Sequence, residues 1–151
     1  MQMIRAPKEP GCFLCTKAAE DKDAENLILE RGQTCMCLMN LYPYSNGHLM
    51  VTPYRHVGDF TALSDQEVTE MMLMARSWVR DLQKVGEPQG FNLGLNLGRA
   101  AGAGVADHVH LHIVPRWGGD TNFMTVLAEA RVINQALEET RLELLRARTT
   151  P

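Results

Sequence analysis

The sequence predicts an α+β fold in which an antiparallel sheet packs against one long helix. Segments with the residue pattern of strands form a hairpin early in the chain, an amphipathic helix follows, and further strands come after it. Groups of strands that precede and follow a single helix in the sequence are typical of α+β folds, whereas parallel α/β folds alternate strand and helix throughout. The chain has 151 residues, enough for one domain with its own core, so we expect a single domain over residues 1–151.

The first half of the chain is expected to contain a short helix, three strands and the long helix. A turn at Gly32 and Gln33 joins the first two strands, and Pro53 ends the third because proline cannot donate to a strand ladder. Ser64 and Glu67 form a capping box, which marks the start of the long helix. The expected elements are a helix over 15–23, strands over 26–31, 34–40 and 48–53, and a helix over 64–85.

Apolar residues recur at helical spacing along the long helix, so one stripe of it should be buried against the sheet. The stripe is rich in methionine, and we assign it to core packing in preference to a groove for a partner. Its residues are Val68, Met71, Met72, Ala75, Trp78, Val79, Leu82 and Val85.

The second half of the chain is expected to complete the sheet and to end in a helix. The charged part of that helix, residues 138–146, should be a solvated face. The expected elements are a fourth strand over 91–97, a glycine-rich loop over 98–104, a fifth strand over 108–114 and a C-terminal helix over 126–148.

Charge and hydropathy argue against several classes of protein. The chain carries 15 Lys and Arg against 18 Asp and Glu, and no basic block suggests binding to nucleic acid or to an anionic membrane surface. No apolar stretch approaches the roughly 20 residues of a membrane span, and residues 1–10 lack the apolar core of a secretory signal. We therefore expect a cytoplasmic protein that binds any phosphate through a local site.

Three of the five histidines occupy alternate positions in His-Val-His-Leu-His-Ile-Val, residues 108–114. In a strand, His108, His110 and His112 would share one face, with successive Cα atoms roughly 7 Å apart. A half-buried strand with a polar face is the simplest interpretation. The presence of three of the five histidines on alternate positions favours a functional site instead. The row is typical of metal ligands, or of a nucleophile flanked by helper groups.

The four cysteines form two closely spaced pairs. Cys12 and Cys15 have the spacing of half a tetrahedral zinc site, which histidines could complete. A thioredoxin-like pair would open a helix after a strand, and nothing upstream of Cys12 resembles that strand. Cys35 and Cys37 fall on one face of an expected strand, where free cysteine commonly serves as a small buried hydrophobe. We expect no disulfide framework.

The histidine-rich segment resembles the signature of the histidine triad family of nucleotide hydrolases and transferases. A second block agrees: Asn40-x-x-Pro43-x-x-x-Gly47-His48 is similar to an earlier segment of the family. The similarity covers about residues 11–124 and uses all five histidines, while the terminal helix lies outside the signature. It implies the family's fold, a homodimer, and one structural zinc per chain. The zinc ligands that the resemblance implies are Cys12, Cys15, His56 and His108.

The resemblance also implies roles for the remaining site residues. His110 would be the nucleophile that attacks the α-phosphorus of an adenine nucleotide, and the backbone carbonyl of His108 would hold its ring. His48 and His112 would bind the phosphate and stabilise its developing charge. Asn40 would hold the ribose hydroxyls.

The loop before the histidines departs from that of many hydrolase members, which place polar side chains on the phosphate. Here the loop runs Gly-Ala-Gly-Val-Ala-Asp, so that the N–H groups around Gly102 and Gly104 are free of bulky side chains, and Arg116 could add a charge. With residues 115–124, this loop resembles the branch that contains bacterial diadenosine tetraphosphate phosphorylases. That branch implies phosphorolysis to ADP and ATP, with inorganic phosphate as the acceptor.

Three alternatives stay open at this point. Water in place of phosphate would make the protein a hydrolase of dinucleoside polyphosphates or of nucleoside phosphoramidates. A catalytic zinc bound by both His108 and His110 would make it a zinc hydrolase. A site that has lost catalysis would leave a nucleotide-binding or metal-binding module.

Overall fold

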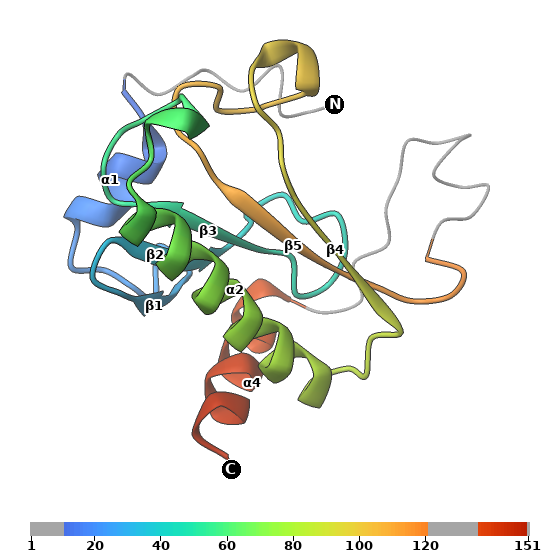
Figure 1. The fold of residues 1–151 in the computed structure, drawn as a ribbon. Coiled ribbons are helices and arrows are strands. Elements are labelled where there is room, and N and C mark those ends of the chain that lie inside the picture. Colours follow the sequence, from blue (N-terminus) through green and yellow to red (C-terminus); the bar gives the residue numbers. More distant parts are fainter. Residues whose placement is uncertain (1–10, 121–135, 151) are drawn as a thin grey trace.

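The computed structural model describes residues 11–120 and 136–150 and contains a five-stranded sheet in the order β1-β2-β3-β5-β4 (Figure 1). Every pair of neighbouring strands is antiparallel, which confirms the expected α+β fold. The strands are β1 (Ile28–Arg31), β2 (Cys35–Met39), β3 (Leu49–Pro53), β4 (Gly90–Leu95) and β5 (Leu111–Arg116). The helices are α1 (Phe13–Ala19), α2 (Asp65–Lys84) and α4 (Leu137–Thr149), with short 3-10 turns η2 (Phe60–Ala62) and η3 (Arg99–Ala101).

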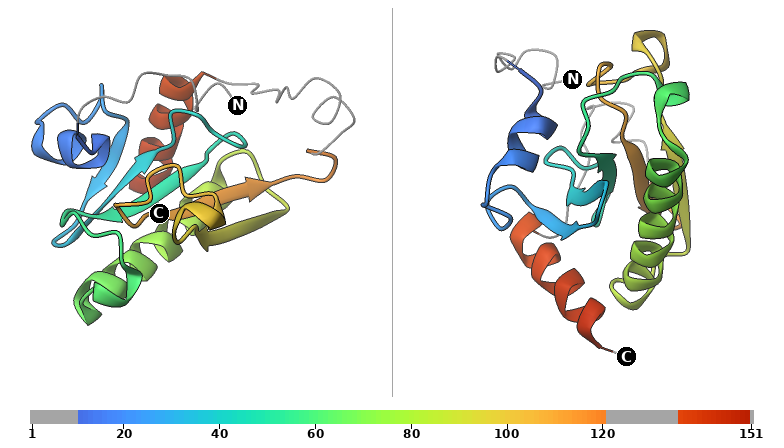
Figure 2. Two further views of the ribbon diagram at one scale, coloured as in Figure 1. Left: turned by 90° about the horizontal axis from the view of Figure 1, so that it is seen from above. Right: turned by 60° about the vertical axis from the view of Figure 1, so that its left-hand side comes forward.

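Different helices cover the two faces of the sheet, and Figure 2 shows α1 and α2 on opposite sides of it. Odd-numbered strand residues such as Ile113 pack against α2 and α4. Met50 of β3 belongs instead to a smaller apolar cluster that includes Leu14 of α1. His112 of β5 lies directly opposite Met50 in the strand register, so the two side chains share a face. The long helix α2 therefore leaves the face that carries His112 uncovered.

Helix α2 begins at the capping box that the sequence predicts. The Ser64 hydroxyl accepts the N–H of Glu67 at 3.1 Å, and the Glu67 carboxylate accepts the N–H of Ser64 at 2.8 Å. Arg55 binds both carboxylate oxygens of Glu67, at 3.0 and 2.7 Å. These hydrogen bonds from Arg55, with that from Ser64, outweigh the effect of burial and lower the pKa of Glu67 to about 2.

The methionine-rich stripe of α2 is part of the core, with one correction. Met71, Ala75, Trp78 and Leu82 are buried, as expected for a stripe at helical spacing. Met72 was expected in the same stripe, but its side chain is 49% exposed. A step of one residue turns a helix by about 100°, which carries Met72 past the edge of the buried stripe.

The fifth strand and the last helix begin later than the sequence predicts. Strand β5 begins at Leu111, so His108 and His110 precede it and only His112 lies within it. Helix α4 occupies the second part of the expected range, and residues 126–135 of that prediction lie outside the described residues. The charged part of α4 is not a fully solvated face, because Arg141 and Leu144 are buried. None of the helices in the described part of the chain is long and apolar enough to cross a membrane.

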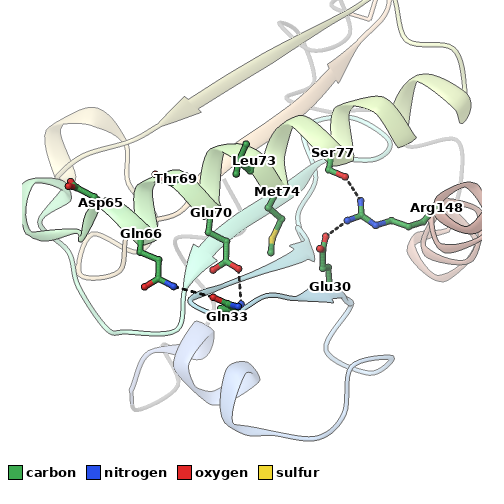
Figure 3. A pocket seen from close by; sticks show the side chains of 10 residues that line it. All are labelled: Glu30, Gln33, Asp65, Gln66, Thr69, Glu70, Leu73, Met74, Ser77 and Arg148. Atoms are coloured by element: carbon green, nitrogen blue, oxygen red, sulfur yellow. Dashed lines mark hydrogen bonds and ion pairs between the residues drawn. The ribbon is translucent and has the colours of Figure 1, made fainter.

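A pocket of about 580 Å³ lies between α2, the β1–β2 turn and the end of α4 (Figure 3). Several of its charged groups are bound within the protein. Glu70 accepts the backbone N–H groups of Gln33 at 2.7 Å and Thr34 at 2.5 Å, and thus ties the hairpin turn to α2. Arg148 of α4 pairs with Glu30 of β1 at 2.5 Å. We assign this pocket to the anchoring of α4 and of the hairpin.

Cys35 and Cys37 are fully buried on β2, as the sequence predicts. Burial raises the pKa of the Cys35 thiol to about 11 and the pKa of Cys37 well above its ordinary value. Thiols held in the protonated form are poor nucleophiles and poor metal ligands. Both residues therefore act as small hydrophobic side chains of the core.

Candidate active site and metal centre

The three alternate histidines divide between two adjoining clusters. The His108 ring lies against Cys12 and Cys15, whereas the His110 and His112 rings meet edge to face with their centroids 4.8 Å apart. The expected single row on a strand is thus only partly correct. Alternation specifies which residues share a face of an extended segment, but the ring of His108 is turned toward the two cysteines.

His110 has one ring nitrogen held by the backbone. Its Nδ1 lies 2.8 Å from the carbonyl oxygen of His108, and the side chain is 7% exposed. A carbonyl oxygen can only accept, so Nδ1 carries the proton and Nε2 of the neutral ring keeps its lone pair. This arrangement gives His110 a defined nucleophilic nitrogen, in the orientation that the sequence resemblance implies.

His112 and His48 form an imidazole pair beside His110. Nε2 of His48 lies 2.9 Å from Nδ1 of His112, and the ring centroids are 5.1 Å apart. Burial, reinforced by the neighbouring His110, lowers the pKa of His112 to about 4. His112 is therefore a neutral imidazole near pH 7, able to donate one hydrogen bond and accept another.

Asn40 directly follows the last residue of β2 and contacts His48 of the imidazole pair. Its Oδ1 accepts the N–H of Tyr42 at 3.0 Å, which fixes the orientation of the amide and directs Nδ2 toward His48, 3.4 Å from Nδ1. Asn40 is half-buried at the surface of the histidine cluster. Its position is compatible with the expected contact to ribose hydroxyls, which remains a proposal.

The second cluster brings together the four expected metal ligands. Donor atoms of Cys12, Cys15, His56 and His108 all lie within 4.8 Å of one another. Sγ of Cys12 is 3.2 Å from Nδ1 of His108, and Sγ of Cys15 is 3.4 Å from Nδ1 of His56. Tetrahedral zinc, with bonds of about 2.3 Å to sulfur and about 2.0–2.1 Å to nitrogen, would place such atoms about 3.6 Å apart. Two thiols and two imidazoles at these distances therefore fit a zinc ion.

The other ring nitrogen of His108 supports the same interpretation. Nε2 of His108 lies 2.8 Å from the carbonyl oxygen of Pro53, at the end of β3. Because that carbonyl accepts the Nε2 proton, Nδ1 is left unprotonated and directed at the thiols. Histidines that bind metals commonly donate their second ring N–H to a backbone carbonyl in this way.

The glycine-rich loop and Arg116 lie at opposite ends of the β4–β5 pair, because the loop joins the strands beyond Leu95 and Leu111 whereas Arg116 pairs with Gly90 at the other end. Gly102 ends η3 with a left-handed φ of 84°, and Gly102 and Gly104 are both exposed. Arg116 forms a bidentate ion pair with Asp120, at 2.6 and 2.8 Å, and also donates to Asn92 at 2.8 Å. This pair was not expected from the sequence, and a phosphate would have to compete with Asp120 for the guanidinium group.

Sequence reasoning missed the contribution of Tyr44 to the site. Its backbone N–H donates to Nδ1 of His48 at 3.0 Å, and its ring stacks on His48 with centroids 5.0 Å apart. Position 44 carries no motif signal, because a backbone N–H is present at every residue except proline. Only the folded path of the loop between β2 and β3 identifies this contact.

Fold and site together define a class: an α+β protein that presents buried, hydrogen-bonded imidazoles beside a Cys₂His₂ cluster. Within that class the chain belongs to the HIT family, since the model of the HIT domain matches residues 21–119. The family expected from the two sequence blocks is thereby confirmed.

The comparisons also identify individual relatives. The chain is 46% identical, over 126 residues and 83% of its length, to an AP-4-A phosphorylase of Mycobacterium tuberculosis, and it spans 65% of that protein. A HIT-like protein of Methanocaldococcus jannaschii is 33% identical over 78% of this chain and 87% of its own. Among solved structures, a Zn-bound histidine triad family protein from Mycobacterium smegmatis matches with a TM-score of 0.75 at 26% identity, covering 91% of this chain and 93% of its own.

Proposed function

We propose that this protein is an enzyme that phosphorolyses diadenosine tetraphosphate to ADP and ATP. The observation that carries the proposal is the 2.8 Å contact between Nδ1 of His110 and the His108 carbonyl, which leaves Nε2 as a buried nucleophile. The similarity to the M. tuberculosis AP-4-A phosphorylase supports the choice of substrate.

The proposed reaction has two half-reactions. Nε2 of His110 attacks the α-phosphorus of one adenylate, the bond to the bridging oxygen breaks, and ATP leaves. An oxygen of inorganic phosphate then attacks the adenylyl group, the phosphorus–nitrogen bond breaks, and ADP leaves with His110 restored. Covalent catalysis of this kind divides one difficult step into two easier ones. In this scheme His48 and His112 bind the phosphate, and Asn40 holds the ribose.

We assign zinc a structural role, one ion per chain. Cys12, Cys15, His56 and His108 would hold it, and four protein ligands leave no open position for an activated water. The rival in which both His108 and His110 bind a catalytic metal is disfavoured, because the cluster of donor atoms includes His108 without His110. Thiolates kept reduced for metal binding favour a cytoplasmic location.

The acceptor in the second half-reaction is the point that product analysis tests. With diadenosine tetraphosphate and phosphate, we expect ADP and ATP, with turnover rising and saturating as phosphate is added. The physical ground is the exposed loop at Gly102 and Gly104, where the lack of bulky side chains leaves room for an incoming anion, although the N–H of Gly102 itself donates to the carbonyl of Arg99 at 3.0 Å. AMP and ATP formed at a rate indifferent to phosphate would instead identify water as the acceptor, and the enzyme as a hydrolase of the same family.

A binding module without catalysis is the remaining alternative. Incubation with diadenosine tetraphosphate in the absence of phosphate, followed by acid-free mass analysis, should trap an adenylyl adduct on His110. Binding of the dinucleotide with neither adduct nor products would identify the module instead.

We also propose a homodimer. Strand β4 is an edge of the described sheet, and Leu93 on it is 43% exposed. An exposed edge with apolar side chains is stabilised by pairing, and twofold symmetry is the commonest way to pair it. Light scattering at micromolar concentration should give the mass of two chains, and the mass of one chain would remove this proposal without affecting the chemistry.

A further inference from the structure

The loop between β2 and β3 places Tyr44 against the imidazole pair in two ways. Its backbone N–H donates to Nδ1 of His48 at 3.0 Å. Its ring stacks on the His48 ring at 5.0 Å and 17°, and lies 6.4 Å from the ring of His112. Tyr44 thus contacts His48 through the backbone and through the side chain at once.

The backbone N–H of Tyr44 determines where the proton of His48 lies. A backbone N–H can only donate, so Nδ1 of His48 must be the unprotonated nitrogen. The Nδ2 group of Asn40 lies 3.4 Å from Nδ1 and 3.5 Å from Nε2 of His48, so this contact does not select between the two nitrogens. A neutral imidazole carries one proton, so the proton of His48 lies on Nε2.

The position of the proton on His48 determines the position of the proton on His112. Nε2–H of His48 donates to Nδ1 of His112 at 2.9 Å. Nδ1 of His112 is therefore also unprotonated, and the ring carries its proton on Nε2. His110 has the opposite arrangement, with its proton on Nδ1 and a lone pair on Nε2, because its partner is a carbonyl oxygen. Two rings 4.8 Å apart thus present a hydrogen-bond donor and a nucleophile.

We propose that Tyr44 is a positioning residue whose backbone N–H sets the tautomer of His48 and, through it, the tautomer of His112. The Nε2–H of His112 is thereby kept as a donor beside the lone pair of His110. The ring of Tyr44 stacks on one face of His48 and supports that imidazole in its position beside His112. The catalytic consequence rests on the proposed function, since a donor at this place is useful for a phosphate whose charge develops during transfer.

The test replaces only the N–H group. Incorporation of the α-hydroxy analogue of tyrosine at position 44 changes that amide to an ester and keeps the side chain. The matched control is the same ester change at Tyr42, which removes the neighbouring contact to Asn40 instead. Tyr44→Phe keeps both the N–H and a stacking ring, and Tyr44→Ala keeps the N–H without the ring.

The readout is the ¹⁵N NMR spectrum of the imidazoles, which distinguishes the two tautomers. In the wild type we expect Nε2–H for His48 and His112, and Nδ1–H for His110. The ester at position 44 should give a mixture of tautomers at His48 and His112, and should lower kcat about tenfold with a smaller change in KM, the effect of losing one hydrogen bond. The ester at position 42, Tyr44→Phe and Tyr44→Ala should keep the wild-type tautomers.

Two results would overturn the proposal: an Nδ1–H tautomer of His48 in the wild type, or unchanged tautomers in the ester at position 44. The spectra need no substrate, so the outcome is separate from the proposed function. A protein with the expected tautomers that forms no product from diadenosine tetraphosphate would overturn the proposed reaction and leave the assignment of Tyr44 intact.

Discussion

Replacement of His110 by alanine should lower kcat by more than a hundredfold while the fold and the zinc content stay unchanged. The His108 carbonyl holds the proton of His110 on Nδ1 and so leaves the lone pair on Nε2, whereas the lone pairs that we assign to His48 and His112 accept hydrogen bonds within the site. Loss of a single acid–base group typically costs about 10²- to 10⁴-fold, and loss of a nucleophile should cost no less.

Steady-state assays with circular dichroism and metal analysis check this prediction. His112→Ala is the matched control, because it removes a neighbouring imidazole that we propose to bind the phosphate without forming a covalent bond. His112→Ala should still give an adenylyl adduct on His110, whereas His110→Ala should give none. A His110→Ala variant that keeps more than about a hundredth of the wild-type rate would falsify the covalent role.

The central helix and the capping box at its start could be predicted from the sequence, because the residues that indicate them are close together in the chain. Ser64 and Glu67 satisfy each other's backbone N–H groups within one helical turn, so the capping box is complete before any tertiary contact forms. The strand boundaries were less well predicted. Alternating residues indicate an extended segment, but the ladder begins at Leu111, where the partners Leu95 and Val51 are available.

The division of the histidines between two clusters could not be predicted from alternation alone. His108 joins the thiols of Cys12 and Cys15, which lie more than ninety positions away in the chain. Such a contact depends on how helix α1 packs beside the end of β3, and the residue pattern of 108–114 contains no information on that packing. The resemblance of the sequence to a family supplied the four ligands, and the geometry of the donor atoms agrees with them.

The contacts of Tyr44 and Arg116 were missed for different reasons. Tyr44 acts in the site through a backbone N–H and a stacked ring, and neither produces a sequence pattern. Arg116 was expected to attract phosphate because it follows the histidines. The acidic residue four positions later forms a bidentate pair with it, at 2.6 and 2.8 Å. A charge in the sequence indicates a possible ligand, and only its neighbours in space decide what it binds.

Cys12→Ser should release the zinc and lower the melting temperature by about 10 °C or more. Metal binding to a structural site contributes directly to the free energy of folding, and 1 kcal/mol is worth roughly 2–4 °C in a domain of this size. Loss of a few kcal/mol therefore gives the expected shift. His56→Ala should behave in the same way, because it removes another of the four donors. Zinc per chain by mass spectrometry and thermal unfolding by circular dichroism measure both effects.

Cys37→Ala is the control for the loss of a thiol as such. Cys37 is fully buried outside the metal cluster, so its truncation should lower stability modestly and leave one zinc per chain. Wild-type protein purified without zinc, or Cys12→Ser protein that retains it, would contradict the four-ligand assignment.

Zinc loss should also reduce turnover at temperatures where the protein stays folded. His108 has two functions: its ring belongs to the metal cluster, and its carbonyl oxygen holds Nδ1 of His110 at 2.8 Å. Without the metal, the ring of His108 loses its anchor to Cys12, and the backbone beside the nucleophile gains freedom. We expect kcat of Cys12→Ser to fall at low temperature while KM changes little, because the residues that we propose for the ribose and the phosphate lie outside the metal cluster. An unchanged kcat in a zinc-free, folded variant would show that the His108 carbonyl is held by β3 alone, through Pro53.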